Sequence, residues 1–149
     1  MSVFVSTRNR SDQVDARLAM VRGLSSDGGL YVPTAIPHIN YKDLSGLSYS
    51  QIAQRIVHAW FDDLSEDDVA GCCDGAYRHF DDARVAPVVK AGDTFILELF
   101  HGETCAFKDV ALSLLPRLLV GSLNQPRQAG IVVERVGRIG YAEALFLLF

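Results

Sequence analysis

Short runs of apolar residues, separated by turn-forming ones, make up the first part of the chain. Residues 3–7 are rich in β-branched and aromatic side chains, which is typical of a strand. Apolar side chains then recur with the i, i+4, i+7 spacing of a helix face, which predicts a helix that begins near Asp12 and ends at Gly23. The Asp-Gly-Gly of residues 27–29 predicts a tight turn, and residues 30–32 predict a second strand.

Two longer helices and a hairpin are expected in the middle of the chain. Apolar side chains repeat every four residues from Ile52 to Trp60, and Ser48 and Ser50 are the candidate caps of this helix. Residues 65–68, Ser-Glu-Asp-Asp, resemble a capping box and predict the start of the next helix. The apolar face of that helix comprises Val69, Cys73, Ala76, Tyr77 and Phe80. Alternation over residues 85–100 predicts a hairpin whose turn is Ala-Gly-Asp.

The clearest helical stripe of the sequence covers residues 107–119, where apolar side chains follow the i, i+3, i+4, i+7 spacing. Pro116 lies inside this stripe. Because proline lacks a backbone N–H and clashes with the preceding turn, we expect a kink in the helix. Residues 131–133 predict one more strand. Helices and strands alternate along the chain, so the predicted fold class is α/β.

Composition excludes several classes of protein. The chain has 149 residues, of which 49% are apolar and 21% charged, and this balance is that of a globular domain. A formal net charge of −4 and scattered basic residues argue against a nucleic-acid partner. The apolar run 144–149 is too short to span a bilayer, and the N-terminus lacks the apolar core of a signal peptide. We therefore expect a cytoplasmic protein without a membrane partner.

The spacing of the cysteines and histidines indicates neither disulfide bonds nor a metal site. Three cysteines, two of them adjacent, do not form a disulfide framework. The four histidines and the cysteine pair lack the spacing of metal ligands, so no metal site is expected. Cys73 fits the apolar face of its predicted helix instead.

Lys108 is the ionisable residue that most favours a chemical role. It lies in the first turn of the 107–119 helix, where the positive end of the helix dipole disfavours a second positive charge. Desolvation by Phe107 would act in the same direction, and a lowered pKa is what a Schiff-base lysine requires. Asp109 would oppose both effects. From spacing alone, a surface lysine that begins a helix is the favoured interpretation.

The residues around Lys108 change this interpretation. Residues 97–109, which read Leu-Glu-Leu-Phe-His-Gly-Glu-Thr-Cys-Ala-Phe-Lys-Asp, resemble the segment around the cofactor lysine of threonine synthases. Residues 6–8 and residues 24–33 resemble two earlier segments of that family, in the expected order. The resemblance covers residues 1 to about 119.

This resemblance implies an activity and a cofactor. Threonine synthases use pyridoxal phosphate to convert O-phosphohomoserine and water into threonine and phosphate. Lys108 is then the catalytic lysine that forms a Schiff base with the cofactor. The resemblance also makes Phe107 and His101 cofactor-binding residues, although a histidine that is hydrogen-bonded within a loop is an equal alternative for His101.

A phosphate-binding loop is expected after the lysine helix. In the family this loop follows a strand and binds the cofactor phosphate at a helix N-terminus. Here residues 131–133 precede a Gly-Arg-Ile-Gly segment, so Gly137 and Gly140 are the expected phosphate-binding residues. The segment departs from the family pattern, because its hydroxyl side chains are missing and Arg138 replaces an acidic residue.

The resemblance also predicts a domain organisation. Residues 1–84 are expected to form the amino-terminal domain of a fold-type II pyridoxal-phosphate enzyme, and residues 85–149 the start of its cofactor-binding α/β domain. Because the family motifs end near Val120, we expect a truncated threonine synthase that is inactive alone. The alternative is a non-catalytic interaction or oligomerisation module that self-associates through the apolar tail 144–149.

Overall fold

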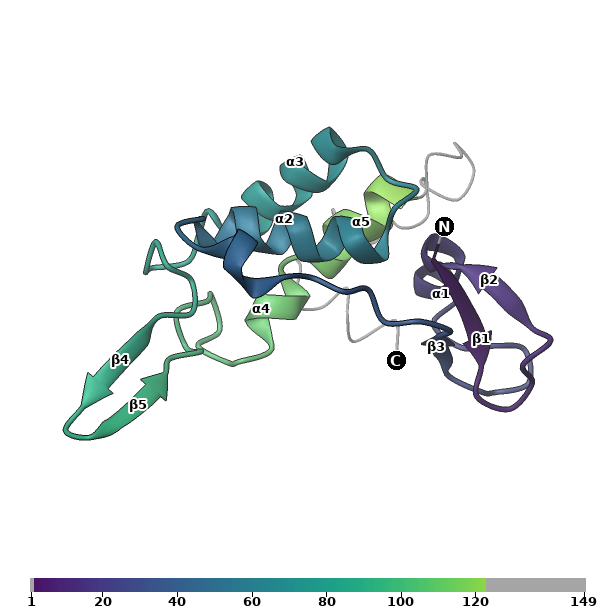
Figure 1. Cartoon of the computed structure of the whole chain (residues 1–149), viewed down its shortest axis with the longest axis horizontal. Coiled ribbons are helices and arrows are strands. Elements are labelled where there is room, and N and C mark those ends of the chain that lie inside the picture. The colour runs from purple at the N-terminus through teal and green to yellow at the C-terminus, as the bar shows by residue number, and fades with distance from the viewer. Residues whose placement is uncertain (1, 123–149) are drawn as a thin grey trace.

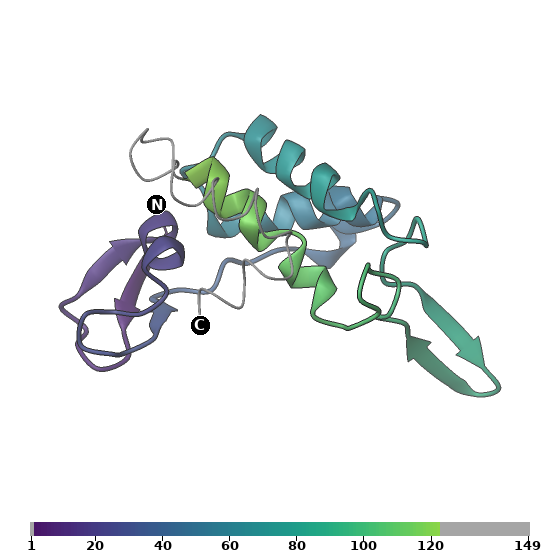
Figure 2. The same cartoon turned by 180° about the vertical axis from the view of Figure 1, so that it is seen from behind.

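The computed structural model describes residues 2–122 and contains a small sheet, a helical body and a projecting hairpin. The sheet and its short helix form one end of the molecule (Figure 1). The helices α2, α3 and α5 form the middle, and the hairpin β4–β5 extends from the opposite end (Figures 1 and 2). The strand expected at 131–133, Gly137, Gly140 and the tail 144–149 lie outside the described residues.

The amino-terminal sheet is antiparallel and has the order β2-β1-β3. β1 (Val3–Ser6) lies between β2 (Gln13–Asp15) and β3 (Tyr31–Pro33). α1 (Ala16–Arg22) follows β2 directly and ends at Gly23, which has a φ of 69°.

The expected start of the first helix was wrong. Residues 13–15 form a strand, and Asp15, not Asp12, caps α1 by accepting a hydrogen bond from the Leu18 N–H. β1 offers backbone groups along both edges, and residues 13–15 pair with one of them. Val14 is buried in this strand, so its apolar character is explained by the sheet rather than by a helix face.

The helical body follows the sequence signals closely. α2 (Tyr49–Trp60) begins with a complete capping box between Ser48 and Gln51, after a short 3-10 turn η1 (Tyr41–Leu44). α3 (Glu66–Tyr77) is capped by Ser65, as predicted. The core of the body is buried between α2, α3 and the last helix and consists of Val57, Leu64, Val69, Cys73, Ala76, Tyr77, Val85 and Leu118.

The predicted 107–119 helix is divided in two. α4 (Asp109–Leu112) and α5 (Leu115–Ser122) are separated by two residues. Pro116 lies in the first turn of α5, where the missing N–H of proline leaves no helical hydrogen bond unmade. A continuous helix would have placed this proline in the interior, where its ring clashes with the turn before it. The expected interruption is therefore confirmed, and it lies just ahead of the proline.

The hairpin formed by β4 (Val88–Ala91) and β5 (Thr94–Leu97) is confirmed. Its turn is shorter than expected and consists of Gly92 and Asp93, because Ala91 belongs to β4 and pairs with Thr94. Its apolar side chains are nevertheless not covered. Phe95 is 70% exposed, and every residue of β5 is exposed. The alternating pattern thus predicted the strand correctly, although neither face of that strand is buried within residues 2–122.

His101 ties the base of this hairpin to the segment after α3. Its Nε2 lies 2.9 Å from a Glu98 carboxylate oxygen, and its Nδ1 lies 2.5 Å from an Asp81 carboxylate oxygen. The side chain is only 13% exposed. The hydrogen bond to Glu98 raises the pKa of His101 most, Asp81 adds to the increase, and partial burial opposes it. Only the protonated ring can donate to both carboxylates.

Three further findings apply to residues 2–122 as a whole. No helix within residues 2–122 is both long and apolar enough to cross a membrane. In this range, no group of three or more potential ligand side chains is arranged to hold a metal ion. Cys72, Cys73 and Cys105 are free thiols, and burial raises the pKa of the Cys73 thiol to about 12, as suits an unreactive core residue.

Replacing Val69 by alanine tests the helical core. Val69 is 1% exposed, so the smaller side chain leaves a cavity between α3 and its neighbours. We expect the free energy of unfolding to fall by about 1–3 kcal/mol. Val88→Ala on the exposed hairpin is the matched control and should change stability by less than about 0.5 kcal/mol. Urea titration followed by circular dichroism measures both, and equal effects would contradict this core.

Replacing His101 by glutamine tests the tie at the hairpin base. Because folding raises the pKa of His101, its protonation stabilises the folded state. This stabilisation is complete below the ordinary pKa of 6.5 and is lost as the pH rises through the pKa of the folded state. The difference in unfolding free energy between wild type and His101→Gln should therefore be larger near pH 5.5 than near pH 8.5. Glu98→Gln should have the same pH dependence, and a difference that does not change with pH would disprove the tie.

Candidate functional site

Lys108 lies at the edge of a cavity between α3 and the α4–α5 segment. It is the residue immediately before α4, and its backbone is already helical. The cavity has a volume of about 700 Å³, within the range of small-molecule sites. Its wall includes Ala76 and Phe80 on the side of α3, and Lys108 and Leu112 on the other side.

Hydrogen bonds hold the backbone around Lys108. Its carbonyl oxygen accepts hydrogen bonds from the N–H groups of Ala111, at 3.0 Å, and Leu112, at 2.8 Å. The hydroxyl of Tyr77 in α3 donates to the carbonyl oxygen of Val110 at 3.2 Å, which joins α4 to the core helix. The lysine backbone is therefore held between its own helix and α3.

Asp109 organises the loop that leads to Lys108. Its carboxylate accepts two hydrogen bonds from Thr104, one from the hydroxyl at 2.6 Å and one from the backbone N–H at 2.8 Å. The residue is only 6% exposed. Gly102 packs directly against this carboxylate, and a Cβ at that position would collide with the Asp109 side chain. The loop therefore needs glycine at this position.

Positive charge and small residues shape the far wall of the cavity. Arg117 of α5 lines it, and its guanidinium lies over Gly75 of α3, where a Cβ would stand 2.6 Å from Nη1. His79 also lines the cavity. Lys108 and Arg117 thus border a cavity that is also lined by the carboxyl side chains of Glu103 and Asp109 and by apolar residues. The two cations suit a ligand that carries an anionic group.

Of the expected site residues that lie within residues 2–122, Lys108 is the one that contributes to this cavity. Lys108 lines it, whereas Phe107 is 66% exposed and is not part of the wall. The expected desolvation of Lys108 by Phe107 was wrong, because Lys108 is itself exposed. His101 lies in the hydrogen-bonded cluster at the hairpin base. Gly137 and Gly140 lie outside the part of the chain that the structure describes.

Sequence reasoning missed three residues of the cavity. Asp109 was considered only as a charge next to Lys108, although its two bonds to Thr104 shape the loop. The sequence gives no signal for Arg117, and it indicates Gly75 only as a residue that weakens its helix, because the two helices that carry these residues meet only in the folded chain. The glycine in the middle of α3, which costs helix stability, was the one signal that could have indicated a close approach there.

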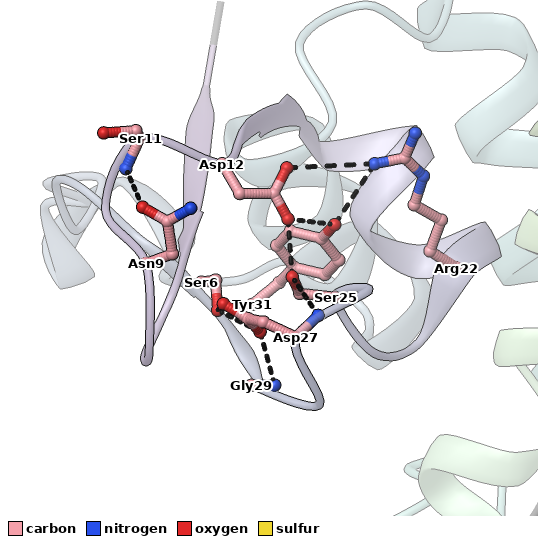
Figure 3. Close-up of polar contacts among 9 residues, drawn as sticks. All are labelled: Ser6, Asn9, Ser11, Asp12, Arg22, Ser25, Asp27, Gly29 and Tyr31. Atoms are coloured by element: carbon pink, nitrogen blue, oxygen red, sulfur yellow. Dashed lines mark hydrogen bonds and ion pairs between the residues drawn. The ribbon is translucent and has the colours of Figure 1, made fainter.

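The other two motifs form a polar network in the amino-terminal sheet (Figure 3). The Asp27 carboxylate accepts hydrogen bonds from the Ser6 hydroxyl at 2.9 Å and from the Gly29 N–H at 2.7 Å. The bond from Gly29 contributes most to lowering the pKa of Asp27. A Cβ on Gly29 would collide with Ser6, so this position also requires glycine.

A second part of the network centres on Asp12, whose carboxylate accepts hydrogen bonds from Ser25 and Tyr31 at 2.6 and 3.0 Å (Figure 3). Arg22 lies 4.0 Å from the same carboxylate and donates to the Tyr31 hydroxyl at 3.2 Å. These bonds close the 24–33 turn onto β1 and α1. The two amino-terminal motifs are thereby explained by the stability of the sheet, away from the cavity.

Comparison with known proteins identifies relatives for most of the chain. The model of the family "Threonine synthase N terminus" matches residues 3–77. The threonine synthase of Pseudomonas aeruginosa is 36% identical in an alignment of 121 residues that covers 78% of this chain and 26% of that protein. The threonine synthase of Saccharomyces cerevisiae is 35% identical in an alignment of 128 residues that covers 78% of this chain and 25% of that protein.

The fold of this chain is also similar to solved structures of threonine synthases. The threonine synthase from Brucella melitensis with bound pyridoxal phosphate superposes with a TM-score of 0.78 and 35% identity, over 84% of this chain and 28% of that one. The chain therefore spans about a quarter of the length of the relatives it matches. The family model matches half of the chain, and the relatives are about 35% identical to it. The chain therefore belongs to the threonine synthase family.

Proposed function

We propose that this chain supplies the lysine-bearing amino-terminal part of a threonine synthase that uses pyridoxal phosphate to convert O-phosphohomoserine and water into threonine and phosphate. Lys108 is the catalytic residue in this proposal. The observation that carries it is the position of Lys108 beside a cavity of ligand size, at the lysine of the family motif. The Brucella relative with bound pyridoxal phosphate supports the choice of cofactor.

The residues around the cavity fit pyridoxal phosphate. The cofactor needs an amine for its aldehyde, a cation for its phosphate and an apolar surface for its ring. Lys108 offers the amine, Arg117 a cation, and Ala76 with Leu112 an apolar surface. Two carboxyl side chains also line the cavity, those of Glu103 and Asp109, and the second is hydrogen-bonded to Thr104, so the phosphate is expected on the side of Arg117.

Each of these residues has a role in the proposed reaction. Bound pyridoxal phosphate supplies an electron sink that stabilises a carbanion at the substrate carbon next to the amine. The Lys108 amine would hold the cofactor at its aldehyde carbon, a condensation in which the aldehyde oxygen leaves as water, and the free amine would carry a proton at Nζ. Arg117 would hold an anionic group on the side of α5, and Leu112 would present an apolar side chain to the cofactor from α4.

Phe107, His101, Gly137 and Gly140 also belong to the proposal as cofactor-binding residues, on the resemblance alone. Residues 1–84 and 85–149 are its two proposed domains, and the cytoplasm is its proposed location. We expect this chain to bind the cofactor weakly, because Lys108 itself is exposed to water. Labelling of Lys108 is therefore a better test of the site than turnover.

Selective labelling of Lys108 tests the proposal directly. The chain has three lysines, and Lys42, Lys90 and Lys108 are all exposed, so exposure alone predicts similar labelling. After incubation with pyridoxal phosphate and reduction with borohydride, peptide mapping should find about tenfold more adduct on Lys108 than on either other lysine, because only Lys108 faces a site that orients the cofactor.

Two variants control this measurement. Lys108→Ala should abolish the selective adduct and leave the labelling of the other lysines unchanged. Lys90→Ala, which removes an exposed lysine on the hairpin, should leave the adduct on Lys108 unchanged. Equal labelling of the three lysines would refute the proposed function. Release of phosphate from O-phosphohomoserine by the 149 residues alone would contradict only the expectation that the site is incomplete.

A second function, an interaction module derived from threonine synthase, is favoured by one observation. Apolar side chains on the hairpin, including Val88, Phe95 and Leu97, are exposed together. An uncovered apolar patch of this kind commonly binds another protein surface.

If this second function applies, sedimentation velocity should show association that increases with concentration and weakens in the variant Phe95→Ser. Deletion of residues 141–149 tests the tail separately. A chain that stays monomeric at all concentrations would exclude self-association through either region.

A further inference from the structure

The carboxylate of Asp109 is unusual in the part of the chain around Lys108, because it is buried and is engaged within its own loop. Both of its oxygens accept hydrogen bonds from a single residue, Thr104. A buried carboxylate is stable only when hydrogen bonds replace its lost contacts with water, and bonds to a charged acceptor are stronger than bonds between neutral groups. The two bonds therefore hold Thr104 firmly against the start of α4.

The loop between these residues would not adopt its conformation easily by itself. Cys105 has a φ of 58°, a left-handed conformation that a side chain with a Cβ rarely adopts. The Cys105 N–H donates to the Gly102 carbonyl oxygen at 3.1 Å, and the Asp109 N–H donates to that of Ala106 at 3.0 Å. These bonds fold residues 102–109 into consecutive tight turns, and Asp109 closes them.

Lys108 lies between this closed loop and α4. Its carbonyl oxygen is bound by α4, and the residue after it is bound to Thr104. Little freedom remains except in the lysine side chain. The direction from which the amine enters the cavity therefore depends on the contact between Asp109 and Thr104.

We propose that Asp109 is a positioning residue for Lys108 and acts through Thr104. This inference rests on the proposed function of Lys108 and goes beyond it, because it assigns the orientation of the amine to one carboxylate. The role assigned to Asp109 is to hold the loop, because the hydrogen bonds of its carboxylate go to Thr104. Its effect is to keep Lys108 directed at the cavity while the cofactor binds.

The variants separate this role from general stability. Asp109→Asn replaces one carboxylate oxygen by an NH₂ group, which cannot accept a hydrogen bond from Thr104. Thr104→Val removes only the hydroxyl donor, whereas Thr104→Ser retains both donors and should restore the wild-type behaviour. Val69→Ala is the control for stability, because it weakens the core without touching the loop.

Two measurements are made on each full chain. The first is the ratio of pyridoxal-phosphate adduct on Lys108 to that on Lys42 and Lys90 after borohydride reduction. We expect Asp109→Asn and Thr104→Val to lower this ratio about tenfold. Thr104→Ser and Val69→Ala should stay within about twofold of wild type. The second is amide hydrogen exchange at Thr104, which should be faster in Asp109→Asn because its acceptor is weakened.

The outcomes distinguish the two proposals. If wild type prefers Lys108 and Asp109→Asn keeps that preference, Asp109 does not position the lysine and the inference is overturned. The same conclusion follows if Thr104 exchange is unchanged in Asp109→Asn, or if Val69→Ala lowers the ratio as much. If wild type shows no preference for Lys108, the proposed function itself fails, and the positioning role fails with it.

Discussion

The burial of one face of α3 is the constraint on which the rest of the structure depends. Val69, Cys73 and Tyr77 project from this face into the core, and α2 and α5 pack against it. Burial of apolar surface is the dominant favourable term in folding, and α3 provides half of the buried residues of the helical core, namely Val69, Cys73, Ala76 and Tyr77. The Tyr77 hydroxyl of α3 also donates a hydrogen bond to the carbonyl oxygen of Val110 in α4. The core helix therefore helps to fix the position of α4, and Lys108 lies immediately before α4.

Two different kinds of packing shape the cavity beside Lys108. On one side, the small residues Gly75 and Ala76 allow α3 to approach Arg117 closely. On the other side, polar bonds between Asp109 and Thr104 fold the loop that leads to the lysine. Apolar packing alone would not select a single path for so short a loop. Directed hydrogen bonds to a buried carboxylate do, because breaking one would leave a charge without a partner.

The family assignment and the geometry explain different parts of the sequence. The motifs at residues 6–8 and 24–33 stabilise the small sheet through Ser6, Asp27 and Asp12 (Figure 3). The motif that ends at Lys108 and Asp109 shapes a cavity instead. The family motifs of this chain therefore have two different physical roles. Two of them stabilise the sheet, and the third places the Lys108 amine beside the cavity.

Local signals in the sequence determined the elements whose ends are made by neighbouring residues. The caps Ser48 and Ser65, the hairpin turn and the break near Pro116 could all be predicted, because each depends on bonds or clashes within a few residues. The sequence also pointed to Lys108 through its motif. Only the tertiary structure decided that residues 13–15 pair with β1, that Asp109 binds Thr104 and that Arg117 meets Gly75. Strand pairing and cavity walls join segments that are distant in the chain or fold back on themselves, and no local periodicity encodes these contacts.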